Sequence, residues 1–240
     1  MEFSPIFSIH SFLDSYFSNS RLSYIGSFQQ RVKSSGSMKD GVPSVRAGCK
    51  KFVMLVDMDC FFAAVVLRKY PQHRSKPVAI AHAHSNDQAN NANSSSELST
   101  CNYIARQKGV KKGMFLGDAI IKCPGLVVLP YDFEGFQEVS GIVADQLRLY
   151  AEQYNGCVEQ VSCDEAYVEI NIDPNDCQHN DIYDFVKSLA EHVRADIVKK
   201  TECTASIGIG SNKVRVLIPL SFVSPVSTNV LKLVSCIATG

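Results

Sequence analysis

The sequence lacks any Cys-x-x-Cys pair and any cysteine–histidine grouping with the spacing of a zinc site. Its nine cysteines are scattered and odd in number. The N-terminus also lacks the charged start, the long apolar core and the small-residue cleavage site of a secretory signal. These absences argue against a zinc module and a disulfide framework, and we expect reduced thiols in an intracellular protein.

Net charge is absent too, because 24 lysines and arginines balance 24 acidic residues. A neutral total gives no sign of nucleic-acid binding by the chain as a whole, so any basic surface must be local. No internal repeat is visible. The apolar stretch from residue 214 is interrupted by Arg215, Pro219, Pro225 and Lys232, which argues against a membrane-spanning helix.

The sequence does contain enough apolar material for a core, since 45% of its 240 residues are hydrophobic. Two of its apolar segments adjoin paired acidic residues. Residues 52–56 form a continuous run typical of a buried strand, and Asp57 and Asp59 come directly after it. Asp164 and Glu165 precede a stretch that alternates like a strand.

Each acidic pair has two interpretations. A carboxylate pair beside an apolar strand is often only a solvated turn. Adjacent strand residues point to opposite faces, so Asp164 and Glu165 could share a ligand only at a strand end or turn. Two such pairs, each with a strand beside it, favour a divalent-metal site at one end of a sheet. There Mg²⁺ would take oxygen ligands, a few from the protein and the rest from phosphates.

The order of patterns is strand, inserted helical material, strand, helix, strand, helix, strand. This order predicts an α+β fold with a ferredoxin-like sheet and helices on one face. Acidic residues at the ends of its central strands would lie on the open side. The expected helices cover 60–70, 103–109, 113–122, 133–154 and 183–200, and the expected strands cover 52–56, 77–81, 126–129, 167–170 and 204–209.

Changes in composition mark further segments. Residues 1–32 carry apolar and aromatic side chains that cannot form a core alone, so we expect this segment to dock on the rest of the chain. Residues 33–50 are polar and predict a flexible linker. Residues 82–99 are rich in Asn, Ser and Ala and predict a mobile loop, in which His82 and His84 are more typical of solvated side chains than of metal ligands.

Three motifs resemble those of the Y-family translesion DNA polymerases. Residues 56–62 (VDMDCFF) look like the family's opening acid motif, residues 103–114 like its fingers motif, and residues 162–166 (SCDEA) like its second acid motif. All three occur in the family's order. The resemblance implies a ferredoxin-like polymerase palm over 51–60 and 129–213 and an inserted fingers subdomain over 61–128. It leaves 214–240 as an atypical apolar tail.

Within that family, the deoxycytidyl (dCMP) transferase branch is the most similar. Residues 113–119 (GMFLGDA), Cys163 and the upstream Ser20-Arg21-Leu22 all resemble it. In that branch the arginine pairs with the incoming cytosine and the leucine occupies the space of the displaced template guanine. The resemblance implies these dCTP-templating roles for Arg21 and Leu22, and a guanidinium fork suits the cytosine acceptors. The alternative is a surface arginine beside a buried leucine.

The resemblance implies a metal site with two Mg²⁺ ions that bridge the primer 3′-oxygen and the triphosphate. The implied catalytic and metal-binding carboxylates are Asp57, Asp164 and Glu165, with the backbone carbonyl of Met58 as a further ligand. Asp59 is not assigned as a ligand, because a local hydrogen-bonding role at the strand end explains it equally well.

A nucleotide pocket is implied as well. Tyr103 and Arg106 match family residues that hold the triphosphate, for which a hydroxyl and a forked guanidinium are suited. Phe62 matches the aromatic residue that lies under the sugar and rejects a 2′-hydroxyl, and Phe61 belongs to the same nucleotide-binding set. An ordinary core aromatic is the alternative for Phe62. Lys213 falls where some members place a phosphate-binding lysine.

The implied function is translesion synthesis in the nucleus, in which dCMP passes from dCTP to the 3′ end of primer–template DNA opposite G or abasic sites. The resemblance stops after Asn212, so we expect a chain truncated after the palm. The thumb, the little finger and the region that docks other translesion polymerase subunits would be absent. A catalytically silent fragment that retains metal and nucleotide binding is therefore the alternative. A two-metal nucleotide cyclase is disfavoured because no cyclase motif occurs, and no membrane partner is expected.

Overall fold

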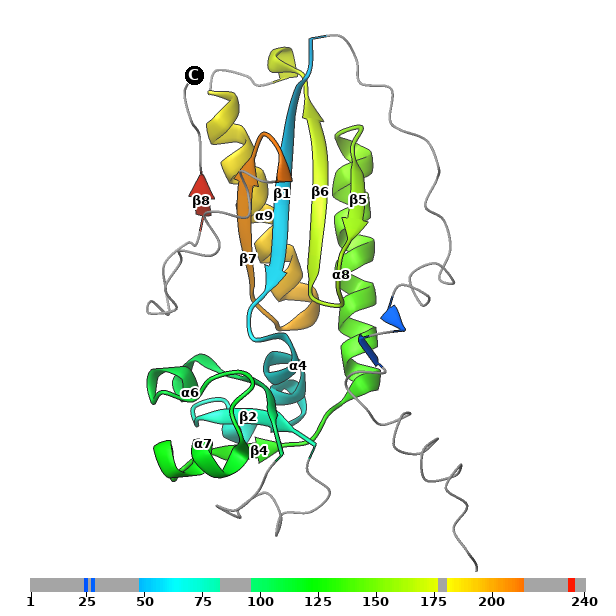
Figure 1. Cartoon of the computed structure of the whole chain (residues 1–240). Helices are drawn as coiled ribbons and strands as arrows, with labels where there is room; N and C mark the ends of the chain where they lie inside the picture. The colour runs from blue at the N-terminus through cyan, green and yellow to red at the C-terminus, as the bar shows by residue number, and fades with distance from the viewer. Residues whose placement is uncertain are drawn as a thin grey trace, which may run out of the picture. The chain divides into compact units, whose positions relative to one another are not determined.

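The computed structural model of the chain describes residues 24–25, 27–28, 48–82, 96–176, 181–213 and 233–235 (Figure 1). The chain forms two compact units, residues 1–40 and residues 41–240. In the first unit Tyr24 and Ile25 are helical. The boundary between the units falls inside the linker predicted over 33–50. Docking of residues 1–32 on the second unit stays a prediction. All helices and strands labelled in Figure 1 belong to the second unit.

The main sheet has five strands in the order β5, β6, β1, β7, β8 (Figure 1). The pairs β5–β6, β6–β1 and β1–β7 are antiparallel, and β8 pairs in parallel with β7. With helix α8 before β5 and helix α9 before β7, the chain order is β1-α8-β5-β6-α9-β7, which confirms the predicted ferredoxin-like fold. The strands are β1 (Lys50–Met58), β5 (Cys157–Gln160), β6 (Glu165–Ile172), β7 (Ala205–Gly210) and β8 (Leu233–Ser235).

Two long helices, α8 (Phe133–Gln153) and α9 (Ile182–Thr201), cover one face of this sheet, behind it in Figure 1. Both are amphipathic, and their first turns are capped by Asp132 and Asp181, whose carboxylates accept backbone N–H groups. On β1 every second side chain points at the helices. The Phe52 ring, for example, meets Tyr183 of α9 edge-on with 5.8 Å between centroids. Asp57, of opposite parity to Phe52 on β1, therefore belongs to the open face.

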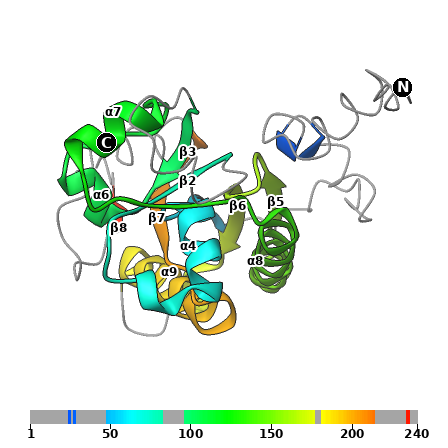
Figure 2. The ribbon, with the colours of Figure 1, turned by 90° about the horizontal axis from the view of Figure 1, so that it is seen from below.

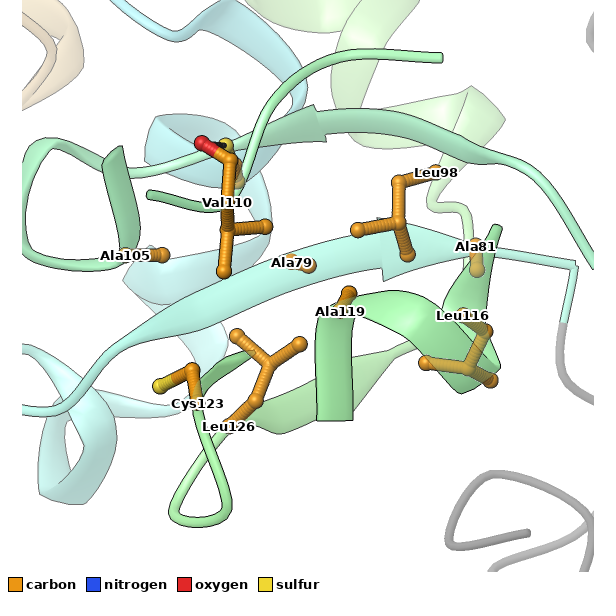
Figure 3. Packing of buried hydrophobic residues seen from close by; sticks show 10 residues of the cluster. Ala79, Ala81, Leu98, Ala105, Val110, Leu116, Ala119, Cys123 and Leu126 are labelled. Atoms are coloured by element: carbon orange, nitrogen blue, oxygen red, sulfur yellow. Dashed lines mark hydrogen bonds between the residues drawn. The ribbon is translucent and has the colours of Figure 1, made fainter. Parts of the chain in front are cut away.

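A smaller sheet comes after the end of β1 in the chain, and it has the order β3, β2, β4. Figure 2 shows β3 beside β2. Strand β2 (Val78–Ala81) is antiparallel to β3 (Leu98–Cys101) and parallel to β4 (Val127–Leu129). Helices α4 (Phe61–Lys69), α6 (Tyr103–Gln107) and α7 (Leu116–Lys122) accompany it, with short 3₁₀ turns at Pro71–His73 and, beyond β6, at Pro174–Asp176. The core around this sheet is made of small and aliphatic side chains: Ala79, Ala81, Leu98, Cys101, Ala105, Val110, Leu116, Ala119, Cys123 and Leu126 (Figure 3).

Several expectations need correction. The inserted segment contains β2 and β4 close to the predicted strands 77–81 and 126–129, and in addition β3, which was not predicted. The loop predicted over 82–99 ends earlier, since Leu98 and Ser99 already belong to β3 and are buried. The hydroxyl of Ser99 donates to the Ile80 carbonyl oxygen at 3.0 Å, so this polar side chain is satisfied inside the core. His84 lies outside the described residues, and the His82 ring lies 6.3 Å from that of Tyr131.

Two further expectations concern the thiols and the membrane. All seven cysteines in the described part of the chain are free thiols. Within that same part, no helix combines the length and the apolar character needed to cross a membrane.

Candidate active site

Three carboxylates lie at the end of the main sheet where β1 ends and β6 begins. Asp57 and Glu165 occupy directly opposed positions in the antiparallel register of these two strands. Asp164 comes immediately before β6, and its carbonyl oxygen accepts the Met58 N–H at 2.9 Å. The register therefore brings together the two acidic motifs that are far apart in the sequence. The backbone of Met58 lies at the same end of the main sheet.

The turn from β5 to β6 orients Asp164. The N–H groups of Val161 and Ser162 both donate to the Glu165 carbonyl oxygen, at 2.9 Å and 3.1 Å, and close a tight hairpin. The Ser162 hydroxyl donates to the Asp164 carboxylate, whose own backbone N–H donates back to Ser162 Oγ at 3.3 Å. Ser162 thus holds the Asp164 side chain in place.

Burial and the closely spaced negative charges raise the pKa values of two of these carboxylates. Desolvation raises the pKa of Asp57 to about 7, and the nearby charges of Asp164, Glu165 and Asp59 add to the effect. Desolvation followed by the charge of Asp164 likewise raises the pKa of Glu165. Asp57 is still exposed as a residue, so an ion from solution can reach its carboxylate. A bound cation would relieve the repulsion.

The donor set suits Mg²⁺, because the side-chain groups are carboxylates, which are hard oxygen ligands. In the described part of the chain, however, no three His, Cys, Asp or Glu side chains are gathered closely enough to hold an ion. The metal-ligand roles of Asp57, Met58, Asp164 and Glu165 stay predictions.

Helix α6 carries the two residues that were predicted to bind the triphosphate. Tyr103 is the first residue of α6, whose N-terminus is capped by Asn102. The Tyr103 hydroxyl donates to Asp59 Oδ1 at 2.9 Å. The Arg106 guanidinium lies 5.3 Å from the centroid of the Tyr103 ring, and its charge lowers the pKa of Asp57. The structure therefore places Tyr103 beside Asp59 and the Arg106 charge within reach of Asp57, and their binding of a triphosphate stays a prediction.

Asp59 has a wider role than the local one expected for it. Its Oδ1 also accepts the hydroxyl of Ser206 at 2.8 Å, although 147 residues separate the two in sequence. Between Asp59 and α4, Cys60 has a left-handed backbone with φ of 48°. That conformation is uncommon for a residue other than glycine, and here it makes the sharp turn from β1 into α4.

Phe61 and Phe62 are both buried in an aromatic cluster where α4 meets α8. The Phe62 ring stacks on Phe136 with 4.3 Å between centroids, and the Phe61 ring lies 5.9 Å from Phe136. The edge of Tyr131 meets Phe62 at 6.3 Å. Phe62 therefore fills the core role that the sequence also allowed, and its contact with the sugar of a nucleotide stays a prediction.

Lys213 lies on the open face of the main sheet. Its ammonium group pairs with Glu159 of β5 and lies 5.1 Å from the centroid of the Tyr167 ring. Tyr167 is two residues from Glu165 on β6 and faces the same way. The Lys213 side chain is half exposed, as is that of Glu159, so the pair is weak and a phosphate can compete for the lysine. Arg21 and Leu22, the predicted templating residues, lie outside the described residues.

Comparison with known proteins identifies the family. The model of the impB/mucB/samB family matches residues 56–216. The chain belongs to the Y-family of DNA polymerases. The main sheet with α8 and α9 is accordingly its palm, and the small sheet with α4, α6 and α7 is its fingers.

Several Y-family relatives are similar to the chain. It is 35% identical over 208 residues to the DNA repair protein REV1 of Arabidopsis thaliana, which covers 83% of this chain and 17% of that protein. It is 34% identical over 180 residues to DNA polymerase IV of Shewanella pealeana, and the match covers 75% of this chain and 43% of that protein. The chain spans less than half the length of these relatives.

Solved structures of the family show the same fold. DinB from Sulfolobus solfataricus matches with a TM-score of 0.58 at 28% identity, over 71% of this chain and 45% of that one. An insertion ternary complex of Dbh DNA polymerase matches with a TM-score of 0.60 at 26% identity, over 77% and 49%. These matches confirm the predicted fold class, a polymerase palm with an inserted fingers subdomain.

The fingers carry an excess of positive charge that the net charge of the whole chain does not reveal. Residues 61–128 hold nine lysines and arginines but only three acidic residues, although the whole chain is neutral. Lys108, Lys111, Lys112 and Lys122 are all exposed, and none of them takes part in an ion pair within the described residues. A count of charge by segment would have revealed this basic subdomain.

Proposed function

We propose that this chain is a nucleotidyltransferase that adds dCMP from dCTP to the 3′ end of a DNA primer during translesion synthesis. The observation that carries the proposal is the in-register pair of Asp57 and Glu165, with Asp164 beside them and Tyr103 and Arg106 opposite. This is the pairing of acidic and phosphate-binding groups that nucleotidyl transfer requires. REV1 proteins from three eukaryotes are among the relatives, which supports the dCMP branch and a nuclear site of action.

The chemistry depends on positioning and charge neutralisation. Asp57, Asp164, Glu165 and the Met58 carbonyl would hold two Mg²⁺ ions, and bound Mg²⁺ would neutralise the charge that develops on the reacting oxygens. The protein's own part is to present these carboxylates on two strands fixed by register. Arg106 offers forked donors to phosphate oxygens, which orients the nucleotide for an in-line displacement.

Further residues would determine which nucleotide is accepted. Phe62 would lie under the sugar and exclude a 2′-hydroxyl, with Phe61 beside it. Lys213 would leave its weak pair with Glu159 and take up a phosphate oxygen. Arg21 would pair with cytosine while Leu22 occupies the space of the displaced template base. The basic fingers would hold the phosphates of primer–template DNA.

The test is single-turnover primer extension with Mg²⁺, using each dNTP separately opposite template G and opposite an abasic site. We expect a preference for dCTP on both templates. Asp164→Ala should abolish extension, because one carboxylate of the metal site is lost. Arg21→Ala should lose the dCTP preference opposite the abasic site, where no template base is left to select the nucleotide.

The outcomes separate the proposal from its alternative. Equal use of all four dNTPs opposite the abasic site by the unmodified chain would refute protein templating. Binding of Mg²⁺·dCTP without any extension at high enzyme concentration would identify a catalytically silent polymerase fragment.

A further inference from the structure

One carboxylate oxygen of Asp59 joins the two subdomains beside the candidate site. It accepts the hydroxyl of Tyr103, from α6 of the fingers, at 2.9 Å and the hydroxyl of Ser206, from β7 of the palm, at 2.8 Å. The backbone N–H of Asp59 donates to the Thr204 carbonyl oxygen at 2.9 Å, which anchors Asp59 to the start of β7. Asp59 is therefore fixed to the palm and holds a side chain of the fingers.

The hydrogen bond to Tyr103 is of a strong type. Its acceptor is a carboxylate, and both residues are partly buried, which strengthens hydrogen bonds to charged groups. The Tyr103 ring also lies against the Arg106 guanidinium, 5.3 Å from its centroid. The ring is thus held at its hydroxyl by Asp59 and across its face by Arg106.

Asp59 can support the affinity for a ligand only if its hydrogen bond to Tyr103 persists in the bound state. A tyrosine hydroxyl carries one proton, so Tyr103 cannot donate to Asp59 and to a phosphate oxygen at once. Tyr103 therefore keeps its proton on Asp59 when a ligand binds and contributes through the position of its ring, while the adjacent Arg106 guanidinium supplies donors to phosphate oxygens. The Ser206 hydroxyl donates to the same Asp59 oxygen and so fixes that oxygen to the palm.

We propose that Asp59 is a positioning residue for Tyr103, which it holds at the place where the triphosphate of an incoming nucleotide binds. Asp59 itself would contact neither metal nor nucleotide. Its contribution is the location of the Tyr103 ring, and hence the affinity for nucleotide. This inference rests on the proposed function, because it takes the ligand to be a nucleoside triphosphate.

The test is the equilibrium dissociation constant for Mg²⁺·dCTP, measured for the whole chain and its variants. Asp59→Ala should weaken binding roughly 10- to 100-fold, the loss expected for one hydrogen bond to a charged group. Tyr103→Phe should weaken it by a similar factor. The double variant should be no weaker than the weaker single variant, because both changes remove one shared interaction. Asp59→Asn keeps an acceptor oxygen in place and should bind within about 3-fold of the unmodified chain.

Asp196→Ala is a matched control. Asp196 Oδ2 accepts the hydroxyl of Tyr150 at 2.6 Å and the amide of Gln146 at 3.3 Å, between α8 and α9. Its removal breaks a comparable tyrosine–aspartate hydrogen bond away from the carboxylate corner. We expect it to lower the thermal unfolding temperature without changing the affinity for Mg²⁺·dCTP.

The inference is overturned if Asp59→Ala leaves the affinity unchanged while Tyr103→Phe weakens it, or if the effects of the two changes multiply. It is also overturned if Asp59→Asn is as harmful as Asp59→Ala, since charge rather than position would then matter. In each of these cases the unmodified chain still binds nucleotide and the proposed function stands. If the unmodified chain binds no Mg²⁺·dCTP, the nucleotide pocket of the proposed function is itself wrong.

Discussion

Asp57 lies among other carboxylates at the end of β1, and this position opposes its ionisation. The pKa of Asp57 is raised to about 7, first by desolvation and then by neighbouring negative charges. A carboxylate must be ionised to bind Mg²⁺. The ionised form of Asp57 is therefore the form that binds the metal, and it is also the form that destabilises the fold when no metal is bound. Active sites often combine function with local instability of this kind.

Replacement of Asp57 by Asn should therefore separate stability from activity. In EDTA we expect Asp57→Asn to raise the thermal unfolding temperature by about 2–4 °C, because one of the repelling charges is removed. Added Mg²⁺ should stabilise the unmodified chain but not the variant, and primer extension should fall at least roughly 100-fold. Differential scanning calorimetry with and without Mg²⁺ makes the measurement.

Asp145→Asn is the control for that experiment, because Asp145 is an exposed residue of α8 that pairs only at the surface with Arg148. It should change neither the Mg²⁺ response nor extension. A lower unfolding temperature for Asp57→Asn in EDTA would show that charge repulsion does not destabilise this corner.

The β5–β6 hairpin carries Asp164 and Glu165, and its geometry depends on Gly156. A Cβ at this position would lie 1.7 Å from the Glu169 carbonyl oxygen, so the backbone would have to shift. We expect Gly156→Ala to lower the free energy of unfolding by more than about 2 kcal/mol, measured by urea denaturation. Gly141→Ala is the matched control, since a Cβ there meets nothing within 4 Å on the exposed side of α8. It should stabilise the chain by about 0.5–1 kcal/mol, and equal effects of the two changes would refute the steric argument.

A polar contact between α8 and α9 should make stability depend on alkaline pH. Desolvation, followed by the hydrogen bond to Asp196, raises the pKa of Tyr150 from 10.0 to about 12. A raised folded-state pKa means that this stabilisation is fully present below about pH 10 and is lost as pH rises through about 12. Urea denaturation across this range should show the loss in the unmodified chain and a flatter profile in Tyr150→Phe. An equal dependence of the free energy of unfolding on pH in the unmodified chain and in Tyr150→Phe would contradict this prediction.

Charge is unevenly distributed over the molecule, with the excess of lysine and arginine in the fingers. If the fingers hold DNA phosphates, affinity for primer–template DNA should fall steeply with salt. Lys111→Gln with Lys112→Gln should reduce the slope of log affinity against log salt by about 0.7–0.9 per lost phosphate contact. The same change at Lys187 and Lys199, exposed on α9, should leave the slope unchanged, as fluorescence anisotropy titrations can show. Equal slopes for both pairs of variants would argue against DNA binding by the fingers.

Much of the fold could be predicted from periodicity because its elements obey simple patterns. Helices α8 and α9 bury apolar residues at helical spacing, and β1 is a continuous apolar run, so each was predicted to within a few residues of its observed bounds. Strand β3 was missed because its sequence, LSTC, is short and half polar. Its burial depends on the hydrogen bond from Ser99 to Ile80, a partner that periodicity does not reveal.

The sequence by itself determined which chemistry is present: carboxylates at strand ends, and a tyrosine and an arginine on one short helix. These depend only on residue types and local spacing. Only the tertiary structure decided that Asp57 opposes Glu165 and that Tyr103 reaches Asp59 and, through it, Ser206. These contacts depend on strand register and on the packing of segments that are far apart in the chain. A shift of one residue in that register would turn Glu165 to the other face, so the site exists only once the whole sheet has formed.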